Sequence, residues 1–130
     1  ALHFHPVLRG ELINGDYDAI LTSELFSLNS LLCSLVKPLK TIVWHELAHH
    51  NHQLFSIPSV FWYNVIVKVF MRNIRVIPRS YKAMDFVKKY SRNVSKHVVT
   101  HGVDLSRFKY SKDRENYFVY VGQLIERKND

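Results

Sequence analysis

The chain has 130 residues, of which 47 % are hydrophobic and 22 % charged, as expected for one folded domain. Its 18 Lys and Arg against 11 Asp and Glu give a net charge of +7, which favours an anionic partner such as nucleic acid, an anionic membrane surface or a phosphorylated ligand. The longest apolar stretch contains Pro58, Asn64 and Lys68, and is too short and polar for the roughly 20 residues of a membrane span. The single cysteine, Cys33, excludes an intramolecular disulfide and indicates a buried thiol in a reducing compartment.

Short β-branched runs alternate with amphipathic runs along the chain. Strands are predicted at 2–5, 17–22, 40–44, 74–78, 96–100 and 116–122, and helices at 7–14, 24–36, 60–73 and 81–90. Ser23 and Ser80 are the predicted N-caps of the helices that follow them, and Pro38 ends the helix before it. This order predicts an α/β fold with a Rossmann-like parallel sheet and helices on both faces.

The predicted helix at 60–73 has two interpretations. Its periodicity places Val60, Tyr63, Val67 and Phe70 on one face. With Lys68, Arg72 and Arg75 nearby, the helix has the composition of a surface that rests on anionic lipid. The general rule that apolar stripes face protein cores favours the other interpretation, a helix that covers the sheet and has basic flanks.

The stretch "TIVWHELAHHNHQ" at 41–53 contains His45, Glu46 and His49 in the H-E-x-x-H pattern of zinc proteases. In those enzymes both histidines project from one helix and the glutamate activates a metal-bound water. Here the lead-in at 41–44 is strand-like, and no Asp or Glu that could serve as a third ligand occurs between Glu46 and Asp85. We therefore favour a strand that ends at Trp44 and a polar, histidine-rich loop without a catalytic metal. Adventitious metal binding by His49, His50 and His52 and the zinc protease stay as alternatives.

Three positions follow predicted parallel strands. These are His45, Ser80 and Gly102, and the carboxyl ends of such strands are where ligands bind. Each has an ordinary structural explanation, since Ser80 can be a helix cap and Gly102 a turn glycine. Their shared edge makes His45 more notable than a lone histidine, and an imidazole can donate to a hydroxyl or phosphate, or move a proton near neutral pH.

The end of the chain carries a resemblance to a known family. "VVTHGVDLSRF" at 98–108, followed by "YFVYVGQLIERKND" at 117–130, resembles the inter-domain passage of retaining nucleotide-sugar glycosyltransferases with the GT-B fold, family 4. Those proteins carry a segment similar to I-P-N-G-V-D-x-x-x-F and then a strand ending in V-G-R-L. Upstream, the strand ending in His45 and the serine of "VIPRS" are similar as well, so the resemblance covers roughly residues 16 to 130 in order.

The resemblance implies a division of the chain and an activity. Residues 1–109 would be the later part of an acceptor-binding Rossmann-like domain, and 110–130 the linker and first strand of a nucleotide-sugar-binding domain whose remainder is absent. The activity would be sugar transfer from a nucleoside-diphosphate sugar to a glycan or lipid-linked acceptor, with retention, without a cofactor, and not by this piece alone. The implied location is the cytoplasm, with the inner face of the cytoplasmic membrane as a peripheral site.

The resemblance also implies roles for individual residues. His45 would be catalytic, Glu46 and Ser80 would line the acceptor side, Gly102, Asp104 and Phe108 would be structural, and Gly122, Gln123 and Lys128 would contact the donor diphosphate. Gln123 stands where such enzymes usually have Arg, and Asn129 where they usually have Gly. A basic, non-catalytic binding module is a further alternative; nucleic acid is not the expected partner, because no reader motif is present.

Overall fold

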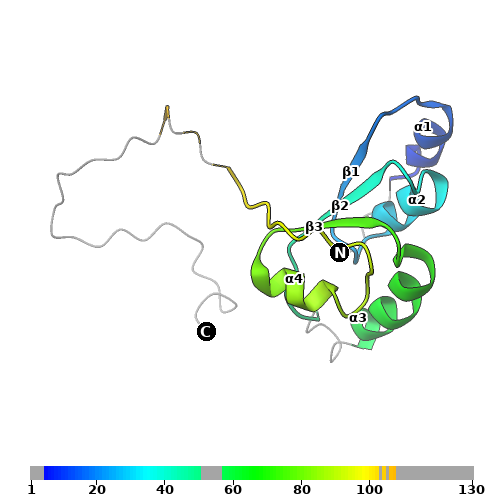
Figure 1. Ribbon diagram of the computed structural model, residues 1–130. Helices are drawn as coiled ribbons and strands as arrows, with labels where there is room; N and C mark the ends of the chain where they lie inside the picture. Colours follow the sequence, from blue (N-terminus) through cyan, green and yellow to red (C-terminus); the bar gives the residue numbers. More distant parts are fainter. Residues whose placement is uncertain (1–4, 51–56, 103, 105, 108–130) are drawn as a thin grey trace, which may run out of the picture.

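The computed structural model describes residues 5–50, 57–102, 104, 106 and 107. Its centre is a three-stranded parallel sheet in the order β1-β2-β3 (Figure 1), formed by Ile20–Ser23, Thr41–His45 and Arg75–Pro78. In the register of the strands, Val43 lies between Thr22 of β1 and Val76 of β3. The predicted α/β class, with a parallel sheet and helices around it, is confirmed.

One helix precedes β1 in the sequence, others connect consecutive strands, and one follows β3. They are α1 (Leu8–Asn14), α2 (Leu28–Val36), α3 (Ile57–Phe61), the π-helix η2 (Trp62–Met71) that continues α3, and α4 (Tyr81–Val87). Helix α2 contacts α1, β1, β2 and η2, while α4 contacts β3. Ser80 is the N-cap of α4 as predicted, because its Oγ accepts a hydrogen bond of 3.1 Å from the backbone N–H of Ala83.

The core lies between the sheet and these helices. Its buried members are Leu25, Val43, Tyr63, Val67, Met71, Ile74, Val76, Phe86 and Val87. Side chains alternate along a strand, so Val43 and Val76 face this core while Trp44 points to the opposite face. There the Trp44 indole N–H donates to the backbone oxygen of Val99 at 2.8 Å, which holds the chain after β3 against that face.

The connection from β1 to α2 differs from the prediction of a helix that starts at residue 24 behind a Ser23 cap. Glu24 adopts a left-handed backbone with φ of 67°, and α2 begins only at Leu28. Leu25 is fully buried, and its carbonyl oxygen accepts a hydrogen bond of 2.8 Å from the Trp62 indole N–H. Burial of Leu25 in the core therefore outweighs the helical propensity of this stretch.

The predicted face of the helix at 60–73 was also partly wrong. Tyr63 and Val67 are buried as expected, but Met71 completes the buried row, and Val60 and Phe70 are exposed. The buried row therefore recurs every fourth residue along the π-helix η2, where the prediction had assumed steps of three and four.

The strand predicted at 96–100 is not formed. The chain follows β3 through one bridge between Val76 and Val94 and through a bond of 3.0 Å from the Val99 N–H to the Pro78 oxygen. Between them, Ser95 Oγ contacts the backbone of His97, and this local turn interrupts pairing with β3. Most of the strand expected at 2–5, and all of that at 116–122, lie outside the described residues. Within the described ranges no helix has the length and apolar character needed to cross a membrane.

Candidate functional site

The carboxyl ends of the three strands bring polar side chains to one edge of the sheet. Because β2 is central and parallel to both neighbours, Glu24 after β1, His45 and Glu46 at the end of β2, and Arg79 after β3 all reach this edge. The backbone closes the edge as well, since the Arg79 N–H donates to the His45 oxygen at 2.8 Å. His45 is the last residue of β2, where the sequence had placed the first residue after the strand.

Glu24 holds the imidazole of His45. The Glu24 Oε2 lies 2.9 Å from His45 Nδ1, a hydrogen-bonding distance that requires the proton on Nδ1 when the carboxylate is ionised. The Leu25 N–H also points at Nδ1, but at 3.4 Å it is the weaker contact. The carboxylate therefore selects the tautomer of neutral His45 that leaves the lone pair on Nε2.

Glu24 is itself fixed by the backbone after β2. Its Oε1 accepts the Glu46 N–H at 2.9 Å and its Oε2 accepts the Leu47 N–H at 3.4 Å. Burial alone raises the pKa of Glu24, but the hydrogen bond and charge of His45 together with these two N–H groups outweigh it and leave the pKa below its ordinary value of 4.5. The carboxylate is thus ionised at neutral pH and bridges the ends of β1 and β2.

The imidazole of His45 is fully enclosed by aromatic side chains. Its exposed fraction is 0 %, its ring is parallel to that of Phe86 at 6.3 Å, and Tyr63 meets it edge-on at 6.2 Å between centroids. Among the described residues neither His45 Nε2 nor the Tyr63 hydroxyl has a hydrogen-bond partner. Burial, with the nearby charge of Glu24, raises the pKa of Tyr63, so its hydroxyl keeps its proton at all ordinary pH values.

Arg79 and Glu46 form a second ion pair at the same edge, in which the Glu46 side chain is 61 % exposed and the Arg79 side chain only 15 %. The Arg79 guanidinium binds Glu46 Oε2, and it lies over the Trp44 ring at 3.7 Å from the ring centroid. The His101 ring meets the Trp44 ring edge-on at 5.1 Å between centroids. Glu46 therefore reaches the predicted rim, but as the partner of an arginine that the sequence did not single out.

The remaining residues that the sequence analysis assigned to the site are described only in part. Ser80 lies at the same edge and uses its Oγ to cap α4. Gly102 has no neighbour within 4 Å of the position that a Cβ would take. The Asp104 carboxylate accepts from Ser106 Oγ at 2.6 Å and from its N–H at 2.9 Å, and these bonds lower the pKa of Asp104. Phe108, Gly122, Gln123 and Lys128 lie outside the described residues.

The described residues do not form the arrangement that a zinc protease needs. The strand β2 runs through His45, and no helix follows at 46–50, so His45 and His49 do not share a helical face. His45 is instead bound to Glu24 inside the core. Over the ranges described here, no cluster of three His, Cys, Asp or Glu side chains has metal-binding geometry.

His50, in the histidine-rich segment after β2, is half-buried and packs against the core. Its ring nitrogens lie 3.2 Å from Ser59 Oγ and 2.9 Å from the Tyr90 hydroxyl, and its ring meets that of Phe86 edge-on at 5.1 Å. Burial, assisted by the charges of Lys89 and His49, lowers the pKa of His50. His50 is therefore neutral near pH 7 and ties the loop after β2 to α3 and to the end of α4.

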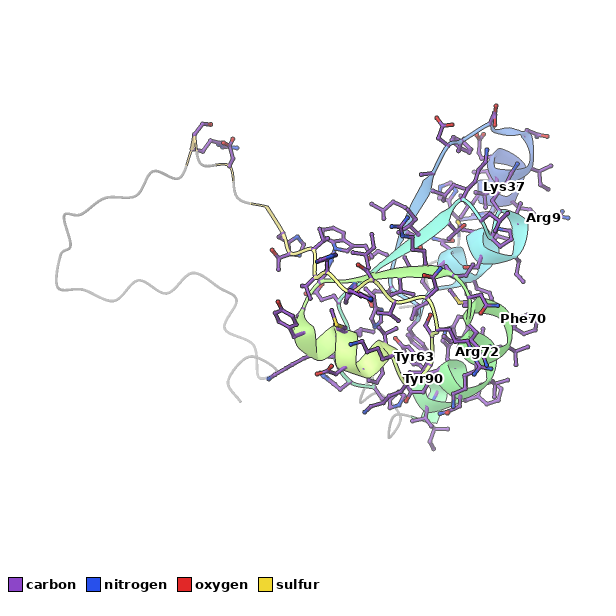
Figure 2. The ribbon with its side chains drawn as sticks, in the orientation of Figure 1. Arg9, Lys37, Tyr63, Phe70, Arg72 and Tyr90 are labelled. Carbon is purple, nitrogen blue, oxygen red and sulfur yellow. The ribbon has the colours of Figure 1, made fainter. Side chains whose placement is uncertain are left out.

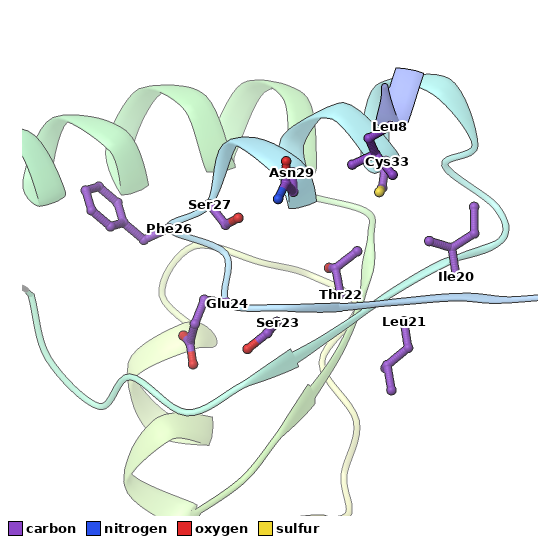
Figure 3. A pocket seen from close by; sticks show the side chains of 10 residues that line it. All are labelled: Leu8, Ile20, Leu21, Thr22, Ser23, Glu24, Phe26, Ser27, Asn29 and Cys33. Carbon is purple, nitrogen blue, oxygen red and sulfur yellow. The ribbon is translucent and has the colours of Figure 1, made fainter. Parts of the chain in front are cut away.

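A pocket of about 480 Å³ runs along β1 and reaches Glu24 (Figure 3). Its lining is apolar at Leu8, Ile20 and Phe26, and polar at Ser27 and Asn29. Strand β1 is an edge strand of the described sheet, so the pocket is open beside it. The sequence did not predict this pocket, because its residues come from α1, β1 and α2 and meet only in the fold.

The residues that sequence reasoning missed are Glu24 and Arg79. Glu24 was assigned to the first turn of a helix, and its contact with His45 joins positions that are 21 residues apart. A charged residue within two positions of the end of a predicted strand was the available signal in both cases. Comparisons of this chain with protein-family models, with curated proteins and with solved structures give no match.

Proposed function

We propose that this chain is part of a glycosyltransferase that moves a sugar from a nucleoside-diphosphate sugar to a glycan or lipid-linked acceptor. The observation that carries the proposal is the Glu24–His45 pair at the carboxyl edge of a Rossmann-like sheet, the edge where such sheets bind ligands. The ordered G-V-D-x-x-x-F and V-G-x-L segments at 102–108 and 121–124 support the same assignment by resemblance. Transfer with retention follows from that resemblance.

In the proposed mechanism His45 acts through Nε2. The Nδ1–H is committed to Glu24, so Nε2 is the nitrogen that can accept a proton from an acceptor hydroxyl or bind the reacting sugar. The Glu24 carboxylate stabilises the imidazolium that would form. Since the imidazole is fully buried, a ligand reaches Nε2 only when a group packed against it, such as Phe86, moves aside.

The donor half of the proposed site lies later in the chain. By resemblance, Lys128 places a cation beside the departing diphosphate, and Gly122 lets the phosphates approach the backbone. Gln123 supplies a neutral hydrogen-bonding side chain where an arginine is usual. Because nucleoside-diphosphate sugars are cytoplasmic substrates in this proposal, the free and buried thiol of Cys33 is consistent with the reducing compartment that we assign.

The test is nucleotide release from a panel of uridine, guanosine and adenosine diphosphate sugars by the natural protein that contains this chain. We expect one donor to release its nucleoside diphosphate slowly to water and faster once an acceptor is supplied. Lys128→Gln should raise the donor KM at least tenfold, and Lys112→Gln, which removes a cation outside the proposed site, should not. Absence of both binding and release across the whole panel would reject the proposal.

A further inference from the structure

The outer face of α3 and η2 exposes a row of apolar side chains. Ile57, Phe61, Val65 and Val69 recur every fourth residue along these two helices, and Ile57, Phe61 and Val69 are 67 %, 59 % and 65 % exposed. We call these four residues the apolar row. The core needs none of them, because Tyr63, Val67 and Met71 on the opposite side of η2 already face the sheet.

A cluster of cations lies beside the apolar row. Lys68, Arg72, Lys88, Lys89 and Arg92 surround one surface hollow of about 80 Å³; we call them the basic cluster. The segments are joined there, since the Arg92 N–H donates to the Arg72 oxygen at 2.8 Å and Lys68 lies 5.5 Å from the centre of the Tyr90 ring. In Figure 2, Phe70 near the end of η2 and Arg72 just after it lie below Arg9 and Lys37.

Negative charge is nearly missing from this half of the chain. Residues 57–102 contain nine Lys and Arg and a single carboxylate, Asp85. Helices α3 and η2 together contain no acidic residue at all. The surface therefore combines exposed apolar side chains with uncompensated positive charge, the combination that holds a helix in the interface of an anionic bilayer.

We propose that the apolar row and the basic cluster dock this protein onto an anionic membrane surface. The cations would contact lipid phosphates while Phe61 and its neighbours enter the boundary between headgroups and acyl chains. Nucleic acid fits less well, because a row of branched and aromatic side chains without stacking partners would face a polar duplex. A protein partner fits less well too, since the buried centre of a protein interface is depleted of charged residues such as lysine.

This docking differs from insertion across the bilayer, since in the described part of the chain no helix is long and apolar enough to span it. It also does not depend on the proposed sugar transfer, because no residue of the apolar row or the basic cluster lies at the carboxyl edge of the sheet. If both proposals hold, the surface would bring the enzyme to a lipid-linked acceptor.

The experiment measures binding of the full 130-residue chain to vesicles by sedimentation, with phosphatidylcholine vesicles containing a quarter phosphatidylglycerol and with pure phosphatidylcholine vesicles. We expect binding to the anionic vesicles only, with strong weakening by salt. Lys88→Gln with Lys89→Gln should lower the partition coefficient about 30-fold, because each cation near such a surface contributes about 1 kcal/mol and about 1.4 kcal/mol is tenfold. Phe61→Ser with Val69→Ser should lower it at least tenfold.

Matched controls change similar side chains elsewhere. Arg9→Gln with Lys37→Gln removes two cations at a distance, and Leu39→Ser removes an apolar side chain that is 100 % exposed in the connection from α2 to β2. Both should bind as the unaltered chain does. Equal binding to neutral vesicles, equal loss in the controls, or a dimer that Phe61→Ser with Val69→Ser dissociates would each overturn the proposal, the last by identifying the surface as an interface between copies.

Discussion

The two halves of the described chain differ in charge and in the side chains that they contribute to the candidate site. Residues 5–50, with β1, α2 and β2, contain three Lys and Arg and five Asp and Glu, and they supply the buried Glu24–His45 pair. Residues 57–102 contain nine Lys and Arg and one carboxylate, and they supply the aromatic side chains that enclose His45. The first half thus provides Glu24, His45 and Glu46 of the candidate site, while the second provides its apolar walls, the cation of Arg79 and a basic outer surface.

This difference explains how a buried histidine is tolerated in the core. A polar group that is removed from water needs a partner of its own, and Glu24 provides one for Nδ1 across the strand ends. The second half contributes ring contacts from Tyr63 and Phe86 instead of hydrogen bonds. The position of His45 is therefore set by the first half, and its isolation from solvent by the second.

The largest expected effect concerns the apolar walls. Tyr63→Ala should lower the free energy of unfolding by about 3–5 kcal/mol, because it leaves a cavity in the middle of the core. Tyr63→Phe should change it little or raise it, since the hydroxyl that it removes is buried without a partner among the described residues. Urea unfolding of both variants checks this, and a large loss in Tyr63→Phe would mean that the hydroxyl has a partner that matters.

The polar side of the comparison is tested at Glu24. Glu24→Ala should lower the free energy of unfolding by about 2 kcal/mol at pH 7, because His45 Nδ1 and the Glu46 and Leu47 N–H groups all lose their acceptor. Because the folded-state pKa of Glu24 is depressed, the stability that its carboxylate contributes is present above pH 4.5 and is lost as the pH falls through that lower pKa. The difference in free energy of unfolding between the unaltered chain and Glu24→Ala should therefore become smaller toward pH 3, as measured by urea unfolding at several pH values. A difference that stays constant from pH 7 to pH 3 would contradict the ionised Glu24–His45 pair.

A smaller effect on stability is expected from the backbone conformation of Glu24, apart from its side chain. Glu24→Gly should be more stable than Glu24→Ala by about 1 kcal/mol, because a left-handed φ of 67° costs a residue with a Cβ and costs glycine nothing. Both variants lack the carboxylate, so the difference in their thermal unfolding at one pH measures only the cost of the left-handed backbone at residue 24. Equal stability of the two would show that this conformation is not strained.

The smallest effect is expected at the Arg79–Glu46 pair. Arg79→Lys should lower the free energy of unfolding by less than about 1 kcal/mol, because a lysine keeps the positive charge beside the exposed Glu46 carboxylate and only the flat contact with Trp44 is lost. The difference should shrink in high salt. A loss comparable to that of Glu24→Ala would contradict the smaller contribution that we expect from the Arg79–Glu46 pair.

The sequence predicted the strands around the site well and the connections poorly. β-branched runs bounded by prolines placed β2 and β3 within one residue of their observed bounds, and Ser80 was identified as a helix cap. These features depend on local chemistry. The left-handed turn at Glu24 and the π-helical winding of η2 depend on what Leu25 and Met71 contact in the folded core, and no local pattern contains that information.

The same limit applies to the site. Topology alone placed His45 at the carboxyl end of a central strand, because parallel strands put their ends at one edge. The partner of His45 follows a different strand, and the rings that bury it come from η2 and α4. Burial of His45 could not be predicted, since a histidine after a strand is equally compatible with an open rim.

In the proposed mechanism His45, held by Glu24, carries out the proton-transfer step of sugar transfer. The decisive experiment compares the kcat of His45→Asn, with the donor that the panel identifies, with that of His97→Asn, which removes an exposed histidine. In His45→Asn the introduced side-chain amide can still donate to Glu24 but offers nothing in place of Nε2. We predict a loss in kcat of roughly 10²–10⁴-fold for His45→Asn with unchanged donor binding, and no loss for His97→Asn. Equal turnover by both variants would contradict a catalytic role of His45.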